Sequence, residues 1–210
     1  MLFRIQLLVV SCVLSLLPAA FAGAIPREVK CSSCEGVVSK DPKYFCGDER
    51  LGPAELPKTA PVSTMLVNYD RFGGLCAKDF LKKYINETSG RYIYPPKPGF
   101  QLSTAKKPTP IDGEEELTVG SLLDRFGAET GGGYFSPAGT PYGQRALPPS
   151  SLNTKEGSPV ADYHVYRVEK PFKMLVGPIA AGFGQSGQGT QYFSINSTKQ
   201  LVDGGCLSRV

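Results

Sequence analysis

Four polar side chains in glycine- or proline-rich stretches of the second half of the chain have the chemistry to contact a ligand. They are Arg125 in DRFG, Arg145 in QRALPP, and Gln185 and Gln191 in FGQSGQGTQY. An arginine is permanently charged and can make two parallel hydrogen bonds to a phosphate. A glutamine amide donates and accepts at once, so it can orient a hydroxyl group or a water molecule. A phosphate-binding loop would also need a Lys-Ser/Thr pair or a following helix, and this glycine-rich stretch has neither.

Aromatic residues accompany these polar groups. Phe126 follows Arg125 directly, and Tyr134 and Phe135 follow three consecutive glycines. Exposed rings offer flat faces for a base or for a pyridinium ring, the second also through a cation–π attraction. Together, these residue types suit a nucleotide with a pyrophosphate better than the substrate of a chain-cutting nuclease.

Each of these residues also has a structural interpretation. Arg125 could form a surface ion pair with the adjacent Asp124, and Phe126 and Phe135 could belong to the core. His164, the single histidine, lies in an alternating stretch and could be a hydrogen-bonded core residue. The residue types alone leave both interpretations open.

Short strands separated by turn residues are expected to position these groups. Residues 163–168 alternate, residues 173–181 form an apolar run, and residues 190–195 begin where the glycine-rich stretch ends. Earlier in the chain, residues 80–85 carry the apolar spacing of one helix, and the proline-rich residues 94–113 predict extended connecting chain. The pattern predicts an α+β fold: a twisted, antiparallel-rich central β-sheet domain with a smaller, disulfide-stapled helical N-terminal lobe.

The first 22 residues predict a secretory signal peptide, because Arg4 precedes an apolar run and a small-x-small cleavage pattern follows. The predicted divisions are a signal peptide at 1–22, a cysteine-containing lobe at 23–110 and a second domain at 111–210, which holds the four polar side chains. No other long apolar run exists in the sequence, so no membrane span is expected and the protein should be extracellular or associated with the cell surface.

Five cysteines follow the predicted signal peptide and indicate a disulfide framework: Cys31, Cys34, Cys46, Cys76 and Cys206. Two bridges would leave one thiol, either free or paired with another chain. A zinc site at Cys31-x-x-Cys34 would need two further close-spaced ligands, so disulfides are favoured and no metal is assigned. Asn86 and Asn196 begin sequons compatible with N-glycosylation.

Four stretches, in matching order over about residues 115–195, resemble the tuberculosis necrotizing toxin (TNT) domain family: LLDRFG, GGYFSPAGTPYGQRALPP, YHVYRV and FGQSGQGTQY. Members of that family include secreted fungal NAD glycohydrolases. The resemblance implies cleavage of the nicotinamide–ribose bond of NAD+ or NADP+, with the dinucleotide as substrate and no required cofactor. Fungal members also suggest a homodimer. Some carry calcium near the C-terminus, but calcium is not assigned here because Asp203 is the only carboxylate in the last stretch.

The resemblance also implies roles for individual residues. Gln191 matches the catalytic glutamine, with Gln185 on the same loop as the alternative. Arg145 is assigned with Gln191 to the catalytic residues, and it also matches, with Arg125, the family's substrate-binding arginines, so it is expected to affect NAD+ binding. The substrate-binding residues that it implies are Arg125, Phe126, Tyr134, Phe135, Gln185 and His164. The glycines would let their loop approach the substrate closely.

Two other functions compete with this hypothesis. A small secreted ribonuclease would share the size and disulfides, but it would ordinarily need two acid/base groups, often histidines. A non-catalytic surface binding module would share the glycines, disulfides and glycans. The net charge is only +4, and the lysines and arginines are scattered along the chain, so the charge does not favour nucleic-acid binding.

Overall fold

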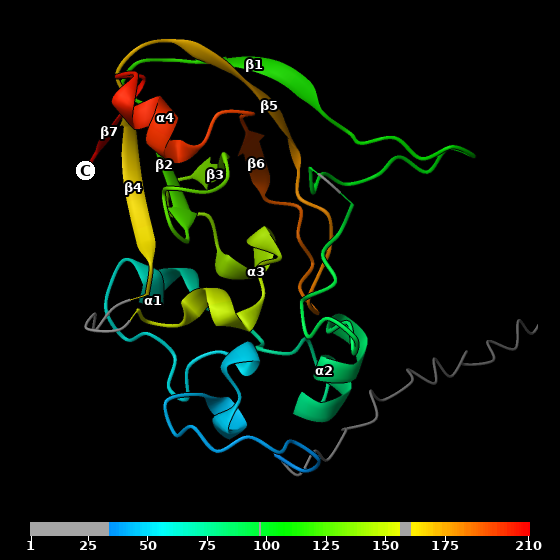
Figure 1. Ribbon diagram of the computed structural model, residues 1–210. Helices are drawn as coiled ribbons and strands as arrows, with labels where there is room; N and C mark the ends of the chain where they lie inside the picture. The colour runs from blue at the N-terminus through cyan, green and yellow to red at the C-terminus, as the bar shows by residue number, and fades with distance from the viewer. Residues whose placement is uncertain (1–33, 97, 156–160) are drawn as a thin grey trace, which may run out of the picture.

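The computed structural model describes residues 34–96, 98–155 and 161–210 (Figure 1). Within these residues the main element is a seven-stranded sheet in the spatial order β1-β5-β6-β3-β2-β4-β7, and each strand is antiparallel to its neighbours. The strands are β1 (Gly113–Leu117), β2 (Leu122–Phe126), β3 (Tyr134–Pro137), β4 (Tyr163–Val168), β5 (Phe172–Pro178), β6 (Thr190–Phe193) and β7 (Leu207–Arg209). The predicted α+β class with an antiparallel sheet is confirmed.

The three strands predicted from the sequence are present with small changes in length. β4 spans the predicted residues 163–168, and its buried side chains are Tyr166 and Val168. β5 ends at Pro178, three residues before the expected end. A proline cannot donate to the ladder, which favours a strand end there. β6 ends at Phe193, and the next backbone N–H, of Ser194, donates to Gly133 in a loop.

One face of the sheet packs against α4 (Thr198–Asp203), which lies beside β7 and β4 in Figure 1. Leu123, Phe135 and Tyr166 of the sheet share a buried cluster with Leu201 of α4. The helix begins with a capping box, in which Ser197 and Gln200 satisfy each other's backbone N–H groups. Because side chains alternate along a strand, the residues between these core positions point to the other face.

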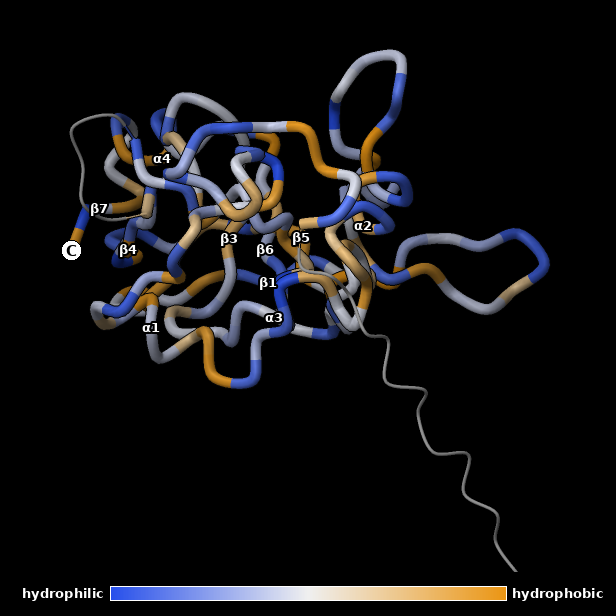
Figure 2. The backbone as a smooth tube through the Cα atoms, turned by 90° about the horizontal axis from the view of Figure 1, so that it is seen from below, coloured by the Kyte–Doolittle hydropathy of each residue, from blue (hydrophilic) through white to orange (hydrophobic). Residues whose placement is uncertain are grey.

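Short helices lie near that other face. They are α1 (Val62–Met65), α2 (Ala77–Tyr84) and α3 (Tyr142–Arg145), with 3₁₀ turns at Phe45–Gly47, Glu49–Leu51 and Pro149–Leu152. α2 confirms the helix expected from residues 80–85, and it buries Phe80. The described residues of the proline-rich connection before Gly113 form no helix or strand, as expected. Phe100 bridges to Ile179, the residue directly after β5. The part between Leu102 and Pro110 projects from the body as an arm (Figure 2).

The glycine-rich stretch in the second half of the chain packs against residues of the first half. A Cβ atom at Gly73 would lie 2.1 Å from the carbonyl oxygen of Gly184, so neither backbone leaves room for a side chain. The backbone N–H of Gly184 donates to the hydroxyl of Tyr84 at 2.9 Å, and Nε2 of Gln185 donates to the carbonyl of Asp70 at 2.6 Å. Gly184 therefore makes a close approach to the backbone at Gly73, whereas the sequence predicted a close approach of the loop to a substrate.

We expect Gly73→Ala to lower the free energy of unfolding by about 2 kcal/mol or more, because the new methyl group meets backbone atoms and the residue has a φ of +59°. The matched control is Gly74→Ala, since Gly74 also has a positive φ but has open space around it. That change should cost only the conformational strain, about 1–2 kcal/mol. Urea unfolding of both variants compares them, and equal losses would contradict the tight contact at Gly73.

The structure partly confirms the disulfide framework predicted from the sequence. Cys34 and Cys46 form a disulfide with an S–S distance of 2.09 Å, Cys76 is disulfide-bonded as well, and Cys206 is a free thiol. Cys31 and the predicted signal peptide lie outside the described residues. Among the helices in the described ranges, none is both long and apolar enough to cross a membrane.

Candidate active site

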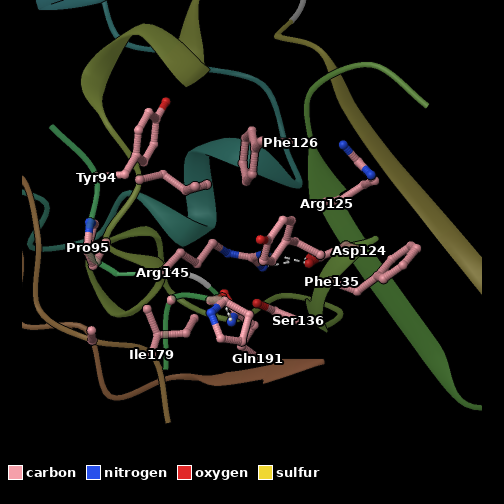
Figure 3. Close-up of a pocket in the computed structure, with 16 residues that line it drawn as sticks. Tyr94, Pro95, Asp124, Arg125, Phe126, Phe135, Ser136, Arg145, Ile179 and Gln191 are labelled. Atoms are coloured by element: carbon pink, nitrogen blue, oxygen red, sulfur yellow. Dashed lines mark hydrogen bonds and ion pairs between the residues drawn. The ribbon is translucent and has the colours of Figure 1, made fainter. Parts of the chain in front are cut away.

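A cavity of about 360 Å³ lies between the sheet and the chain at Tyr94, Pro95, Pro98 and Gly99 (Figure 3). Its walls come from β2, β3 and β6, from helix α3, and from Tyr94, Pro95, Pro98 and Gly99. The volume falls in the range of about 300–1,000 Å³ that is typical of small-molecule sites. The cavity therefore brings together groups that lie almost one hundred residues apart in the sequence.

Asp124 and Arg145 form a buried ion pair in the wall of the cavity. Nη1 of Arg145 lies 2.5 Å from Oδ1 of Asp124, and Nη2 lies 2.8 Å from Oδ2. The two side chains are 3% and 0% exposed. Asp124 also accepts from the backbone N–H of Gly139 and from the hydroxyl of Tyr163. Arg145 is thus fixed by a carboxylate that compensates its charge.

This pairing shows which arginine is the partner of Asp124, a question that the sequence left open. Asp124 was considered as a surface partner of the adjacent Arg125, but the strand turns these two side chains to opposite faces. Asp124 pairs with Arg145, which comes from α3, 21 residues along the chain. Helix α3 ends with Ala146 in the left-handed region, with a φ of +47°, directly after Arg145. The surface ion pair of Asp124 with Arg125 is therefore wrong.

Arg125 is also buried, with 9% of the residue exposed, but it has no ion pair among the described residues. Nη1 donates to the carbonyl of Gly132 and to the hydroxyl of Thr198, and Nη2 donates to the carbonyl of Ala128. In the described part of the chain, its Nε has no hydrogen-bond partner. Burial lowers the pKa of the guanidinium. A buried cation without a counter-ion favours an anionic ligand.

The three predicted aromatic residues all line the cavity, with different degrees of exposure. Phe135 is 2% exposed and packs edge-on against Tyr166, while Phe126 packs against Tyr142 and Tyr163. Tyr134 is 36% exposed and its ring lies 4.8 Å from that of Phe193. Phe135 therefore serves the core and the cavity wall together.

The structure separates the two candidate glutamines. Gln191 lies in β6 and lines the cavity, and its Nε2 donates to the carbonyl of Pro98 at 2.8 Å. This bond uses one of the two N–H groups of the amide, so Oε1 and the second N–H are available to a ligand. Gln185 is 8% exposed and donates to the carbonyl groups of Asp70 and Phe183, away from the cavity walls. Its contacts are those of a structural residue.

His164 lies outside the walls of the cavity. Its Nε2 is 2.7 Å from Oδ1 of Asp162, and Lys155 contacts the other carboxylate oxygen. Glu129 is the acceptor of a second cluster, where hydrogen bonds from Arg209 and Tyr166 lower its pKa to about 2. The structure thus groups these carboxylates with cations and does not bring them into the cavity.

The sequence indicated no role for some of the residues that line the cavity. Ser136 lies in the stretch GGGYFSP and was visible there as a polar position beside Phe135. Tyr94, Pro95 and Pro98 lie in a stretch that its prolines marked only as connecting chain. Nothing local in that stretch indicates a cavity wall, because its contacts are made with Gln191 of β6 and with Phe183, across the fold.

The remaining assigned positions lie at the surface. Asn86 and Asn196, which begin the two sequons, are both exposed. Within the described ranges, no group of three or more His, Cys, Asp or Glu side chains has the arrangement of a metal site.

The chain is similar to a known protein family and to a known fungal protein. Residues 116–210 match the family model described as tuberculosis necrotizing toxin. A conidial surface nicotinamide adenine dinucleotide glycohydrolase of Aspergillus fumigatus is 45% identical over 179 residues, which is 84% of this chain and 75% of the relative.

Two solved structures resemble the chain more distantly. Tuberculosis necrotizing toxin, in complex with its immunity factor, is 22% identical with a TM-score of 0.47, over 64% of this chain and 71% of the toxin. Tse6 in complex with Tsi6 is 18% identical with a TM-score of 0.33, over 47% of this chain and 71% of the other. Such overlaps add nothing to the assignment, which rests on the family model and the fungal relative. On that basis, the chain belongs to the tuberculosis necrotizing toxin family.

Proposed function

We propose that this protein is an NAD glycohydrolase, which cleaves the nicotinamide–ribose bond of NAD+ to give nicotinamide and ADP-ribose. The observation that carries the proposal is the 45% identity, over 84% of the chain, to a fungal protein named for this activity. The cavity supports it, since Gln191, Arg125 and the aromatic residues that the family resemblance singled out all line it.

The charge of the cavity suits a dinucleotide. Two arginines, Arg125 and Arg145, and one carboxylate residue, Asp124, line the cavity, so its walls carry a net positive charge. Arg125 is the cation without a carboxylate partner among the described residues, and it is therefore the stronger candidate for a contact with a substrate oxygen. Arg145 supplies a fixed wall and adds to the positive potential. In our proposal these groups position the pyrophosphate and the ribose.

The reaction needs little proton transfer. When the C–N bond breaks, nicotinamide takes both bonding electrons and leaves as a neutral molecule, because its ring was cationic in the substrate. The ribose becomes oxocarbenium-like, water adds to C1′, and the added water loses one proton. The barrier therefore lies in stabilising the ribosyl cation and in admitting water, and a general acid for the leaving group is dispensable.

Gln191 is the residue that we propose acts on this cation. Because Nε2 is held by the carbonyl of Pro98, the partial negative charge of Oε1 is available to the ribose. Oε1 could accept a hydrogen bond from a ribose hydroxyl, or it could lie against the developing positive charge. Both contacts strengthen in the transition state. Phe126 and Phe135 would border the nicotinamide ring in the enclosed part of the cavity.

The test is to incubate the purified chain with NAD+ and quantify both products. We expect nicotinamide and ADP-ribose in equal amounts and no cleavage of single-stranded RNA offered in parallel. Release of RNA fragments would favour the ribonuclease alternative. If neither substrate changes, while thermal unfolding shows a folded protein, the proposed activity is wrong and a binding function remains.

Several finer features belong to the same proposal. We infer that the chain is secreted or attached to the cell surface, glycosylated at Asn86 and Asn196, and able to hydrolyse NADP+ as well. The division into a lobe at 23–110 and a catalytic domain at 111–210, and a homodimer, are proposed on the family resemblance. Calcium remains unassigned.

A further inference from the structure

Tyr94 is an exposed aromatic residue at the mouth of the cavity. It is 60% exposed, whereas Phe135, in the wall of the same cavity, is 2% exposed. Figure 3 shows Tyr94 and Pro95 on one side of the cavity, and Arg125 and Phe135 on the other. The aromatic walls thus run from an enclosed end to an open rim.

The ring of Tyr94 is held in place although it is exposed. Its centroid lies 5.3 Å from that of Phe183 with an interplanar angle of 81°, and 6.0 Å from that of Tyr92 at 69°. Phe183 is 1% exposed and belongs to the core between the two halves of the chain. Two edge-to-face contacts orient the ring and still leave it exposed to solvent. The ring is therefore already ordered before a ligand binds.

The dinucleotide has two flat rings, and only one of them takes part in the reaction. The nicotinamide and its ribose need the enclosed end, where the protein replaces bulk water around the reacting bond. The adenine takes no part in bond breaking and can lie at an open rim. An aromatic platform of this kind contributes about 1–3 kcal/mol per stacked base.

We propose that Tyr94 is the residue on which the adenine ring of the substrate stacks. The inference rests on the proposed NAD glycohydrolase function and adds to it a specificity-determining residue. Tyr94 lies outside residues 116–210, which match the family model. The N-terminal half of the chain would therefore hold the adenine end of the substrate, in addition to fixing Gln191 through Pro98.

The variants are Tyr94→Leu, which keeps apolar bulk without a flat ring, and Tyr94→Phe, which keeps the ring. Stacking on adenine is the same in the ground state and the transition state, so it affects binding and leaves the chemical step unchanged. Tyr94→Leu should raise KM for NAD+ by about 10-fold and leave kcat within about 2-fold. Tyr94→Phe should behave like the wild type, as should Ile93→Ala, a control at an exposed neighbour that does not line the cavity.

Calorimetric titration with ADP-ribose decides which ring is recognised, because this product keeps the adenine and lacks the nicotinamide. We expect Tyr94→Leu to weaken ADP-ribose about 10-fold, in parallel with KM. Unchanged ADP-ribose binding with a raised KM would assign Tyr94 to the nicotinamide end and overturn the proposal. No change in either quantity would also overturn it, as would a larger loss in Tyr134→Leu, the other exposed ring of the cavity. The titration needs no turnover, so failure of this inference is distinguishable from absence of NAD+ cleavage.

Discussion

Arg145→Met should lower the free energy of unfolding by about 3–5 kcal/mol, because it leaves the carboxylate of Asp124 buried without a cation. Asp124 is 0% exposed and receives two hydrogen bonds from the guanidinium. Such a loss is a large part of the about 5–15 kcal/mol that stabilises a typical domain. The sequence alone predicted an effect of Arg145 on NAD+ binding, whereas the structure makes stability the first quantity to measure.

Two comparisons make this prediction specific to the buried pair. In the double variant Asp124→Asn/Arg145→Met both charges are gone, so it should be more stable than Arg145→Met alone. Arg209→Met removes an exposed partner of Glu129 and should cost less than about 1 kcal/mol. Urea unfolding gives all three values. A loss below 1 kcal/mol in Arg145→Met would show that the pair is not essential to the fold, and a raised KM in the folded variant would then support a contact with substrate.

Gln191→Ala should lower kcat about 100-fold with little change in KM, which corresponds to about 2.7 kcal/mol of lost transition-state stabilisation. The reason is that the amide oxygen is expected to act on a positive charge that develops only as the glycosidic bond breaks. Steady-state rates of nicotinamide release measure both constants, and thermal unfolding checks that the variant is folded.

Gln185→Ala is the matched control, since Gln185 lies six residues before Gln191 and carries the same amide. It should lower stability by about 1–3 kcal/mol through the lost hydrogen bond to Asp70, with kcat close to that of the wild type. If Gln185→Ala lost most of its kcat while Gln191→Ala kept a nearly normal kcat, Gln185 would be the catalytic glutamine. Equal and mild losses in both would mean that these side chains shape the site without supplying the catalytic group.

The sequence by itself determined the local elements and the kinds of group in the site. Alternation over residues 163–168 and the apolar spacing in α2 were sufficient, because a strand or helix with one buried face must repeat apolar residues at its own period. The ordered motifs around Arg125, Arg145 and Gln191 also carried the family, and these residues do meet in one cavity.

What only the tertiary structure decided is which partner each group has. Asp124 pairs with Arg145 because strand alternation turns Asp124 away from Arg125 and toward α3. Gln191 lines the cavity because of its position in β6, whereas Gln185 packs against Asp70, 115 residues away. Contacts across such separations depend on how the elements pack, and no short stretch of sequence encodes them. The same reason explains why Tyr94 and Pro98, within a stretch marked only as extended chain, form a wall of the site.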